Sequence, residues 1–365
     1  MTDKVGLIIG VGSVGRRHVK VMATRYPKLI VVDPSTAARE WVLSEVSATA
    51  KCFASVNDAS PFLQQHSDQI TAVVANWGPD HVQTIQLLVS LGIRRIVCEK
   101  PLANSLQAVV AIEELCKSSS LLLAMGFHLR YRGITDFVRD TSKHELGGLP
   151  TSCIVEGGAR CVSTSGSHWL DLAIDVFGEP PNSVAASLRG TSINPRSESL
   201  QYWDGVATWS FPTGHRLTVC YDNASSVHET VRFYCHSGIL EIDPELNVRA
   251  FARNPAELEA DPRLVRVGVV QRKQPVAEFS SNFQEVLTEQ LDEVEGLRPP
   301  RYTVKEIIDS AASLVAAFES SRLGRQISLP PSPEVIAAGI DWAIDRKSTR
   351  LNSSHTDISR MPSSA

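Results

Sequence analysis

Residues 5–15 read Val-Gly-Leu-Ile-Ile-Gly-Val-Gly-Ser-Val-Gly and determine the expected architecture more than any other stretch. The apolar first half predicts a buried strand, and a helical pattern follows it. Between the two stand Gly10, Gly12 and Gly15, in G-x-G-x-x-G spacing. The first glycine permits a tight turn, the second lets a diphosphate approach the backbone, and the third lets the helix pack on the strand. The stretch predicts a dinucleotide-binding turn; a structural glycine turn in another α/β fold is the alternative.

Asp33 supplies the second part of this pattern, because it follows the apolar run 29–32 and stands 23 residues after Gly10. A carboxylate at this place accepts hydrogen bonds from the ribose hydroxyls of NAD and repels the 2′-phosphate of NADP. We therefore expect NAD as the cofactor, with NADP less favoured. Ser13 and Val14 open the helix, so their main-chain N–H groups are expected to face the phosphates.

The first third of the chain alternates apolar strands with helical stretches. Further strands are predicted at 29–32, 72–75, 95–98 and 121–125, with helices between them such as 81–91 and 106–118. Continuous apolar strands separated by helices are typical of a parallel sheet covered on both faces. We expect a Rossmann dinucleotide-binding domain over residues 1–125.

After residue 125 the pattern changes. A helix is predicted at 166–177, followed by period-2 runs at 183–188, 205–211, 216–221, 230–235 and 238–242. Helical spacing returns at 283–294 and 304–320. Consecutive strands joined by short breaks indicate an antiparallel sheet. We expect an α+β domain with a largely antiparallel sheet over residues 126–335.

Composition narrows the class of protein. The 365 residues carry 36 Lys+Arg against 40 Asp+Glu, a net charge of -4, and 43% are hydrophobic. This is ordinary for a globular protein and argues against a nucleic-acid binder, which needs a basic face. No apolar run is long enough to cross a bilayer, so no membrane partner is expected. Seven cysteines, an odd number without C-x-x-C spacing, favour the reducing cytoplasm, without a disulfide frame or a metal site.

The last residues read differently from the rest. Residues 345–355, Asp-Arg-Lys-Ser-Thr-Arg-Leu-Asn-Ser-Ser-His, resemble one translated frame of a common sequencing adapter. The apolar periodicity ends there, and Ser, Thr, Arg and Asn replace it. We exclude 345–365 from the fold as an artefactual disordered tail. A natural disordered tail is the alternative.

Four further motifs follow in order along the chain. They are Asn76-Trp-Gly-Pro-Asp-His81, Glu99-Lys100-Pro101, Gly166-Ser-His168-Trp-Leu-Asp171, and a stretch from Thr303-Val-Lys-Glu to Gly324-Arg-Gln-Ile. Together with the glycine turn they resemble the Gfo/Idh/MocA family of oxidoreductases over roughly residues 5–330. The resemblance implies hydride transfer between NAD(P) and a carbinol or carbonyl carbon of a sugar, polyol or nucleotide-sugar derivative. It also implies cofactor contacts by Asn76, His81, Glu99 and Lys100.

The residue types suit this chemistry. His168 is suited as a general base because the unperturbed pKa of histidine is near 6.5. Lys100 offers a positive charge beside the developing alkoxide or carbonyl oxygen. Asp171 lies three residues after His168, on the same helix face, and is expected to orient the imidazole or bind a substrate hydroxyl. The alternatives are a solvated Glu-Lys surface pair and a structural histidine.

One position departs from the pattern of the family. Thr164 stands four residues before His168, where the family usually has an aspartate. We expect this hydroxyl to bind substrate. His128 and Arg130 are also expected to contact substrate, Arg130 by gripping a carboxylate or phosphate; an ordinary interdomain salt bridge is the alternative.

Two other functions remain open from the sequence. One is a catalytically weakened dinucleotide-binding protein that serves regulation or assembly, favoured by the loss of the aspartate. The other is a different Rossmann reductase with an α+β cap. We expect a small-molecule, sugar-like substrate. We also expect a homodimer or homotetramer formed through the sheet of the C-terminal domain, because its outer face otherwise stays uncovered.

Overall fold

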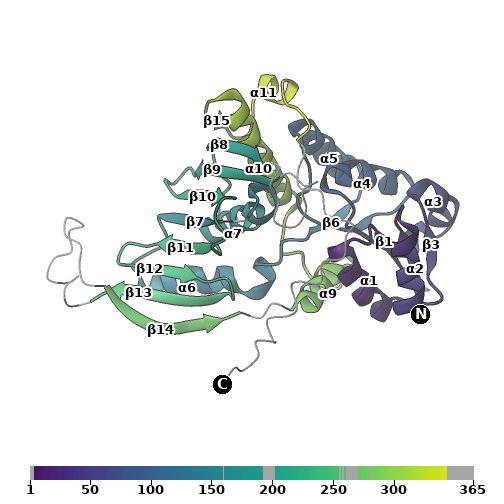
Figure 1. Ribbon diagram of the computed structural model, residues 1–365, viewed down its shortest axis with the longest axis horizontal. Coiled ribbons are helices and arrows are strands. Elements are labelled where there is room, and N and C mark those ends of the chain that lie inside the picture. The colour runs from purple at the N-terminus through teal and green to yellow at the C-terminus, as the bar shows by residue number, and fades with distance from the viewer. Residues whose placement is uncertain are drawn as a thin grey trace.

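The computed structural model describes residues 4–158, 160–191, 202–254, 256, 259, 270–279 and 282–342. The stretch 345–365, with its adapter-like sequence, lies outside the described residues. Two sheets organise the described chain, one in the N-terminal third and one in the remainder (Figure 1).

Sheet A has six parallel strands in the order β3-β2-β1-β4-β5-β6. In chain order they are β1 (Val5–Ile9), β2 (Lys28–Val32), β3 (Lys51–Phe53), β4 (Ile70–Val74), β5 (Arg95–Cys98) and β6 (Leu122–Met125). The chain reverses its direction of travel across the sheet between β1 and β4. In an open parallel sheet, ligands bind beyond the carboxyl ends of the strands at such a point.

Helices cover both faces of sheet A, which explains the unbroken apolar runs. They are α1 (Ser13–Arg25), α2 (Thr36–Glu45), α3 (Val56–Gln65), the short η1 (Ser67–Gln69), α4 (His81–Ser90) and α5 (Leu106–Ser118). All five residues of β1 are buried. Leu7 and Ile9 belong to one hydrophobic cluster and Ile8 to another, so alternate side chains pack on opposite faces.

Sheet B has nine strands in the order β14-β13-β12-β11-β7-β10-β9-β8-β15. They are β7 (Ser152–Gly158), β8 (Ser183–Thr191), β9 (Tyr202–Ser210), β10 (Arg216–Asp222), β11 (Thr230–Tyr234), β12 (Gly238–Ile242), β13 (Asn247–Arg253), β14 (Val270–Glu278) and β15 (Ile327–Ser328). Of the strand pairs, β7 and β10 run parallel and the others run antiparallel. The predicted fold class, a Rossmann domain followed by an α+β domain with a largely antiparallel sheet, is confirmed.

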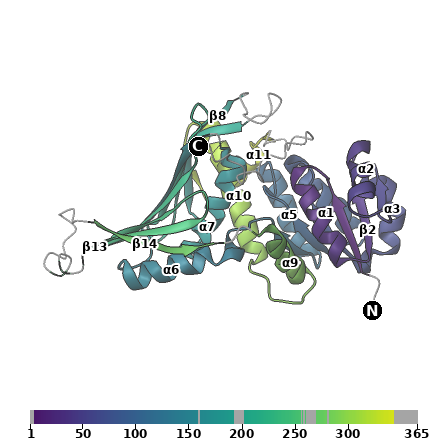
Figure 2. The ribbon, with the colours of Figure 1, turned by 60° about the horizontal axis from the view of Figure 1, so that its bottom comes forward.

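Helices lie on the face of sheet B that is turned toward sheet A (Figure 2). They include α6 (Ile134–Glu145), α7 (Ser167–Phe177) and α10 (Val304–Leu323). In β10, Leu217, Val219 and Tyr221 are buried while Thr218 and Cys220 are half-buried, so only one face is covered by the described chain. This one-sided burial produces the period-2 pattern seen in the sequence.

The last helices join the two halves. Helix α9 (Phe283–Val294) returns to pack against α1, β5 and β6, and Leu287 and Leu291 enter the cluster on that face of sheet A. Helix α11 (Pro333–Ala337) follows β15 and contacts α5. Helix α9 thus belongs to the second half of the sequence but packs on the sheet of the first half. The predicted domain boundary at residue 125 therefore stays a proposal. Among the described helices, none is both long and apolar enough to span a membrane.

Candidate functional site

The glycine turn has the shape that its spacing predicted. Gly10 has a φ of 92°, and a Cβ there would lie 2.6 Å from the backbone of Asn76. A Cβ on Gly15 would lie 2.0 Å from the carbonyl oxygen of Gly10. A Cβ on Gly12 would meet nothing within 4 Å. Gly10 and Gly15 are thus required by the chain itself, whereas the space beside Gly12 is open to a ligand.

The open space lies in front of the N-terminus of α1. Gly12 is the N-cap, no side chain caps the helix, and its first turn holds no acidic residue. The first N–H groups of a helix have no intrahelical partner and carry partial positive charge. The N–H groups of Ser13 and Val14 therefore fit a diphosphate, as the sequence predicted.

Asp33 is held beside this turn at the end of β2. Its Oδ2 accepts a hydrogen bond from the N–H of Val11 at 2.7 Å, and its Oδ1 accepts one from the N–H of Ser35 at 2.8 Å. Arg39 donates to the carbonyl oxygen of Asp33, not to the carboxylate. The carboxylate is 9% exposed and keeps lone pairs for ribose hydroxyls.

The loops after β4 and β5 are tied together by His81. This buried imidazole lies 2.8 Å (Nδ1) from the carbonyl oxygen of Pro101 and 3.2 Å (Nε2) from that of Asn76. The Asn76 amide donates to the hydroxyl of Thr84 at 2.9 Å. Both ring nitrogens of His81 thus face main-chain carbonyls. His81, which the sequence predicts as a cofactor contact, holds the two loops together through these carbonyls.

Glu99 is also engaged within the chain. Its Oε1 lies 2.8 Å from Nε2 of His18, and both side chains are nearly fully buried. This pair ties the end of β5 to α1. The cofactor contact expected of Glu99 stays a prediction, and its partner His18 could not be predicted because the two residues are far apart in sequence.

Lys100 connects the two halves of the molecule. Its Nζ donates to the main-chain carbonyl of Thr164 at 3.1 Å. Thr164 lies in the π-helical turn η4 (Val162–Gly166), which leads directly into α7 and His168. The ammonium group from the Rossmann half therefore lies beside the turn that carries the imidazole of the other half. Thr164 takes part through its backbone.

Two imidazoles meet next to this turn. The ring centroids of His128, which follows β6, and His168 lie 4.3 Å apart in an edge-on arrangement. Nδ1 of His168 is buried and has no hydrogen-bond partner among the described residues. Burial, and then the charges of Arg132 and Lys100, lowers the pKa of His128 to about 3. Burial, and then His128 and Lys100, lowers the pKa of His168 well below its ordinary value. Both rings are neutral at physiological pH.

Arg132 is a further charged residue that follows His128 closely and that the sequence did not single out. It ends the short turn η3 (Arg130–Arg132). Its Nε is buried without a hydrogen-bond partner in the described chain, and burial lowers its pKa to about 10. It stands four residues after His128, whose ring contacts that of His168, and its charge contributes to the low pKa of both imidazoles.

Arg130 and Asp171 lie together in the protein interior. Nε and Nη2 of Arg130 donate to the two carboxylate oxygens of Asp171 at 3.1 and 2.8 Å, and Nη1 donates to Glu306 at 3.0 Å. The hydroxyl of Tyr302 also donates to Asp171. The guanidinium fork is used within the chain. The structure therefore does not bring Asp171 into a hydrogen bond with His168. It places Arg130 in a salt bridge whose partners, Asp171 and Glu306, both lie within residues 126–335, so the bridge is not the interdomain one named as the alternative.

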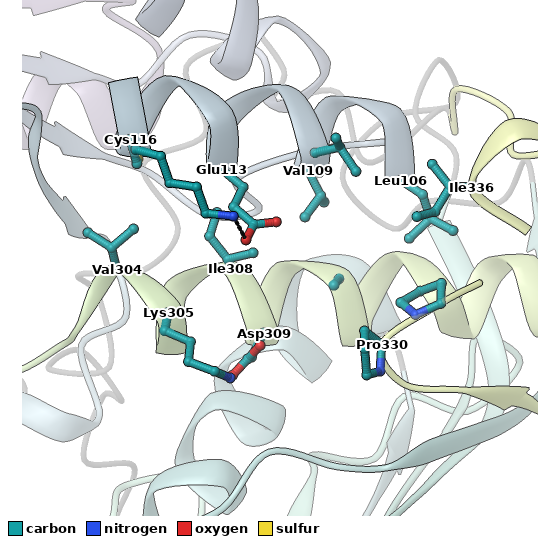
Figure 3. Close-up of a pocket in the computed structure, with 14 residues that line it drawn as sticks. Leu106, Val109, Glu113, Cys116, Val304, Lys305, Ile308, Asp309, Pro330 and Ile336 are labelled. Carbon is teal, nitrogen blue, oxygen red and sulfur yellow. Dashed lines mark hydrogen bonds and ion pairs between the residues drawn. The ribbon is translucent and has the colours of Figure 1, made fainter. Parts of the chain in front are cut away.

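A separate groove of about 600 Å³ lies between α5 and α10 (Figure 3). Val109 and Ile308 project into it from the two helices, and Pro330 and Ile336 line one end. None of its lining residues belongs to the cluster around His168. Within the described ranges, no three His, Cys, Asp or Glu side chains are grouped to hold a metal ion.

Comparison with known proteins relates the N-terminal part of the chain to a family of oxidoreductases. Residues 5–127 match the model of GFO_IDH_MocA, an oxidoreductase family with an NAD-binding Rossmann fold. Within these residues the match bears out the predicted family resemblance and the expected NAD-binding Rossmann fold. An uncharacterized oxidoreductase of Schizosaccharomyces pombe is 28% identical over 153 residues, which span 37% of this chain and 41% of that relative.

Solved structures share the whole architecture. Myo-inositol 2-dehydrogenase of Lactobacillus plantarum superposes with a TM-score of 0.65 at 18% identity, covering 90% of this chain and 99% of that one. An oxidoreductase of Agrobacterium radiobacter, in complex with NAD+, L-tartaric acid and magnesium, gives a TM-score of 0.64 at 16% identity, covering 90% and 98%. At these identities the likeness shows the fold.

Substitutions at Gly15 and Gly12 test separately the stability of the turn and its binding of NAD. For Gly15→Ala we expect the unfolding free energy to fall by about 1–3 kcal/mol, because the new Cβ overlaps the backbone. For Gly12→Ala we expect a change within about 1 kcal/mol, but NAD affinity at least about tenfold weaker. Chemical denaturation and NAD titration measure both. Unchanged NAD affinity in Gly12→Ala would contradict the placement of the diphosphate.

A substitution at Arg130 tests its structural role. We expect Arg130→Met to lower the unfolding free energy by about 3–5 kcal/mol, because Asp171 is left buried and unpaired. Arg298→Met breaks a surface ion pair with Glu289 and is the matched control, with a loss within about 1 kcal/mol. Full stability of Arg130→Met together with loss of substrate binding would favour the substrate contact instead.

Proposed function

We propose that the chain is an NAD-binding oxidoreductase that transfers hydride between nicotinamide and a carbinol or carbonyl carbon of a sugar-like substrate, because residues 5–127 match the model of the GFO_IDH_MocA oxidoreductase family. The substrate class comprises sugars, polyols and nucleotide-sugar derivatives. The observation that carries the proposal is the contact of Lys100 with the turn before His168. It brings an ammonium and an imidazole from different halves to one cleft.

The residues of the cleft have complementary roles in this proposal. Bound NAD supplies the hydride acceptor. As hydride leaves the carbinol carbon, the hydroxyl must lose its proton, and a neutral imidazole is ready to accept it. His168 is neutral because its pKa is lowered by burial and neighbouring charge. Since its Nδ1 is buried, we assign proton transfer to Nε2.

Lys100 acts on the oxygen in this scheme. An ammonium group in a water-poor cleft stabilises negative charge that develops on the reacting oxygen. The carbonyl of Thr164 accepts a hydrogen bond from the ammonium of Lys100. This main-chain acceptor orients Lys100 without the carboxylate that the family usually places at position 164.

A second candidate is a dinucleotide-binding protein with weakened catalysis. Two observations favour it: threonine at position 164, and the commitment of Asp171 to Arg130 and Tyr302. Together they leave His168 without a carboxylate partner among the described residues. An imidazole without such a partner is less firmly oriented.

The preferred ligands follow from the same geometry. The fixed carboxylate of Asp33 supports NAD rather than NADP. Structures with this fold include a myo-inositol dehydrogenase and an oxidoreductase in complex with L-tartaric acid, both of which have polyhydroxylated ligands or substrates. We also propose a homodimer or homotetramer that buries the outer face of sheet B, which no described helix covers (Figure 2).

The test is turnover of a panel of polyols and sugars with NAD. We expect Lys100→Met and His168→Ala to lower kcat by about 10²–10⁴-fold, as for loss of an electrostatic or acid–base group. NAD binding should persist in both. Lys117→Met and His144→Ala remove exposed residues of the same types and serve as controls.

Two outcomes would contradict the proposal differently. NAD binding by the wild type without turnover of any substrate favours the second candidate. Turnover that persists in both cleft variants favours a different reductase chemistry.

The pH dependence of kcat/KM follows from the environment of His168. The base acts in its neutral form, which is lost as pH falls through its pKa. Burial and the charges of His128, Lys100 and Arg132 lower that pKa, against a smaller raising effect of Glu99. We therefore expect the acidic limb for alcohol oxidation to lie below about pH 6.5. A limb at or above this pH, absent in His168→Asn, would contradict the neutral-base assignment.

A further inference from the structure

Two cationic residues belong to the segments that meet at His168: Nζ of Lys100 reaches the turn before it, and Arg132 stands four residues after His128. Lys100 and Arg132 act on both imidazoles, and the carboxylate named with them is that of Glu99. Glu99 already pairs with His18. This carboxylate is thus already engaged within the chain.

Arg132 differs from Arg130 and Arg160, which both lie near carboxylates. Arg130 pairs with Asp171 and Glu306, and Arg160 lies 3.6 Å from Glu229. Arg132 forms no ion pair with any residue that the structure describes, and its Nε is buried without an acceptor. A buried donor without an acceptor costs free energy unless a ligand supplies one.

The chain fixes Arg132 in this position. The guanidinium of Arg130 is clamped by Asp171, and the hydroxyl of Tyr131 donates to Glu293 at 2.8 Å. The N–H of Arg132 donates to the carbonyl of Leu129 at 3.2 Å. Turn η3 is therefore anchored through both preceding side chains, so the backbone that carries Arg132 is held in place.

The position of η3 relates Arg132 to the reacting groups. Strands β5 and β6 are neighbours in sheet A, and Lys100 and His128 follow their carboxyl ends. Arg132 stands four residues after His128, whose ring contacts His168. Arg132 is thus one short turn away from the histidine that contacts His168.

We infer that Arg132 binds a carboxylate of the substrate, so that the sugar-like substrate is a polyhydroxy acid such as an aldonate or uronate. This inference rests on the proposed function. The planar guanidinium fork matches a carboxylate with two parallel hydrogen bonds. A phosphate carries more charge and usually meets several cations or a helix N-terminus, whereas η3 offers one guanidinium.

The experiment compares acids with neutral counterparts of the same carbon skeleton. The pairs are D-gluconate with D-glucitol, D-galactonate with D-galactitol, and D-glucuronate with D-glucose; D-glucose 6-phosphate tests a phosphate. Each is assayed for kcat/KM with NAD and for the shift in Tm with NADH present. In the wild type we expect at least one acid to exceed its neutral counterpart in both.

Variants of Arg132 test whether this residue causes the preference for acids. Arg132→Gln should lower kcat/KM for the acid by roughly 10- to 100-fold, the loss expected for charge-assisted hydrogen bonds, and abolish its Tm shift. Values for the neutral counterpart should stay within about threefold. Arg132→Lys keeps the charge but loses the forked geometry, so its kcat/KM for the acid should lie between those of the wild type and of Arg132→Gln. Arg298→Gln is the control.

The two readouts distinguish this inference from the proposed function. Acid-dependent Tm shifts that require Arg132, without turnover, overturn the hydride-transfer proposal and keep the anion site. Turnover of neutral substrates with no preference for acids, and no effect of Arg132→Gln, overturns the anion site and keeps the oxidoreductase. A preference for the phosphate over all acids overturns the carboxylate assignment.

Discussion

The hydrogen bond from Nζ of Lys100 to the carbonyl of Thr164 joins the two halves of this protein at its candidate active site. Lys100 is placed by β5, whose carboxyl end lies at the ligand-binding edge of sheet A. Thr164 is placed by the turn that starts α7 and carries His168. Because the acceptor is a main-chain atom, the contact does not depend on the side chain at position 164. A shift of either half would separate the ammonium from the imidazole.

Charge balance distinguishes the cleft from the surrounding interior. The network around Arg130 is internally paired, since Asp171, Glu306 and Tyr302 satisfy it. The cleft itself keeps two neutral imidazoles and an arginine without a described partner. The first arrangement holds α7 and α10 against η3. The second leaves positive potential for an anionic ligand.

The sequence predicts local structure well where one periodicity dominates. Strands β5 and β12 and helix α5 have the predicted bounds, and the Rossmann turn has the predicted shape. Strand β7 was missed because it ends in two glycines, required by close approach of residues 225–229. Without β7, the parallel pairing with β10 could not be predicted. The sequence also could not show that the guanidinium of Arg130 is paired within the chain, because its partners lie 41 and 176 residues away.

A crystal structure of the chain with NAD tests the central claim most directly. The account predicts a diphosphate against the N–H groups of Ser13 and Val14, and a nicotinamide ring in the cleft of Lys100 and His168. Both Nζ and Nε2 should then reach one substrate oxygen within about 3–3.5 Å. A nicotinamide ring bound elsewhere, or an imidazole turned away from it, would contradict the account.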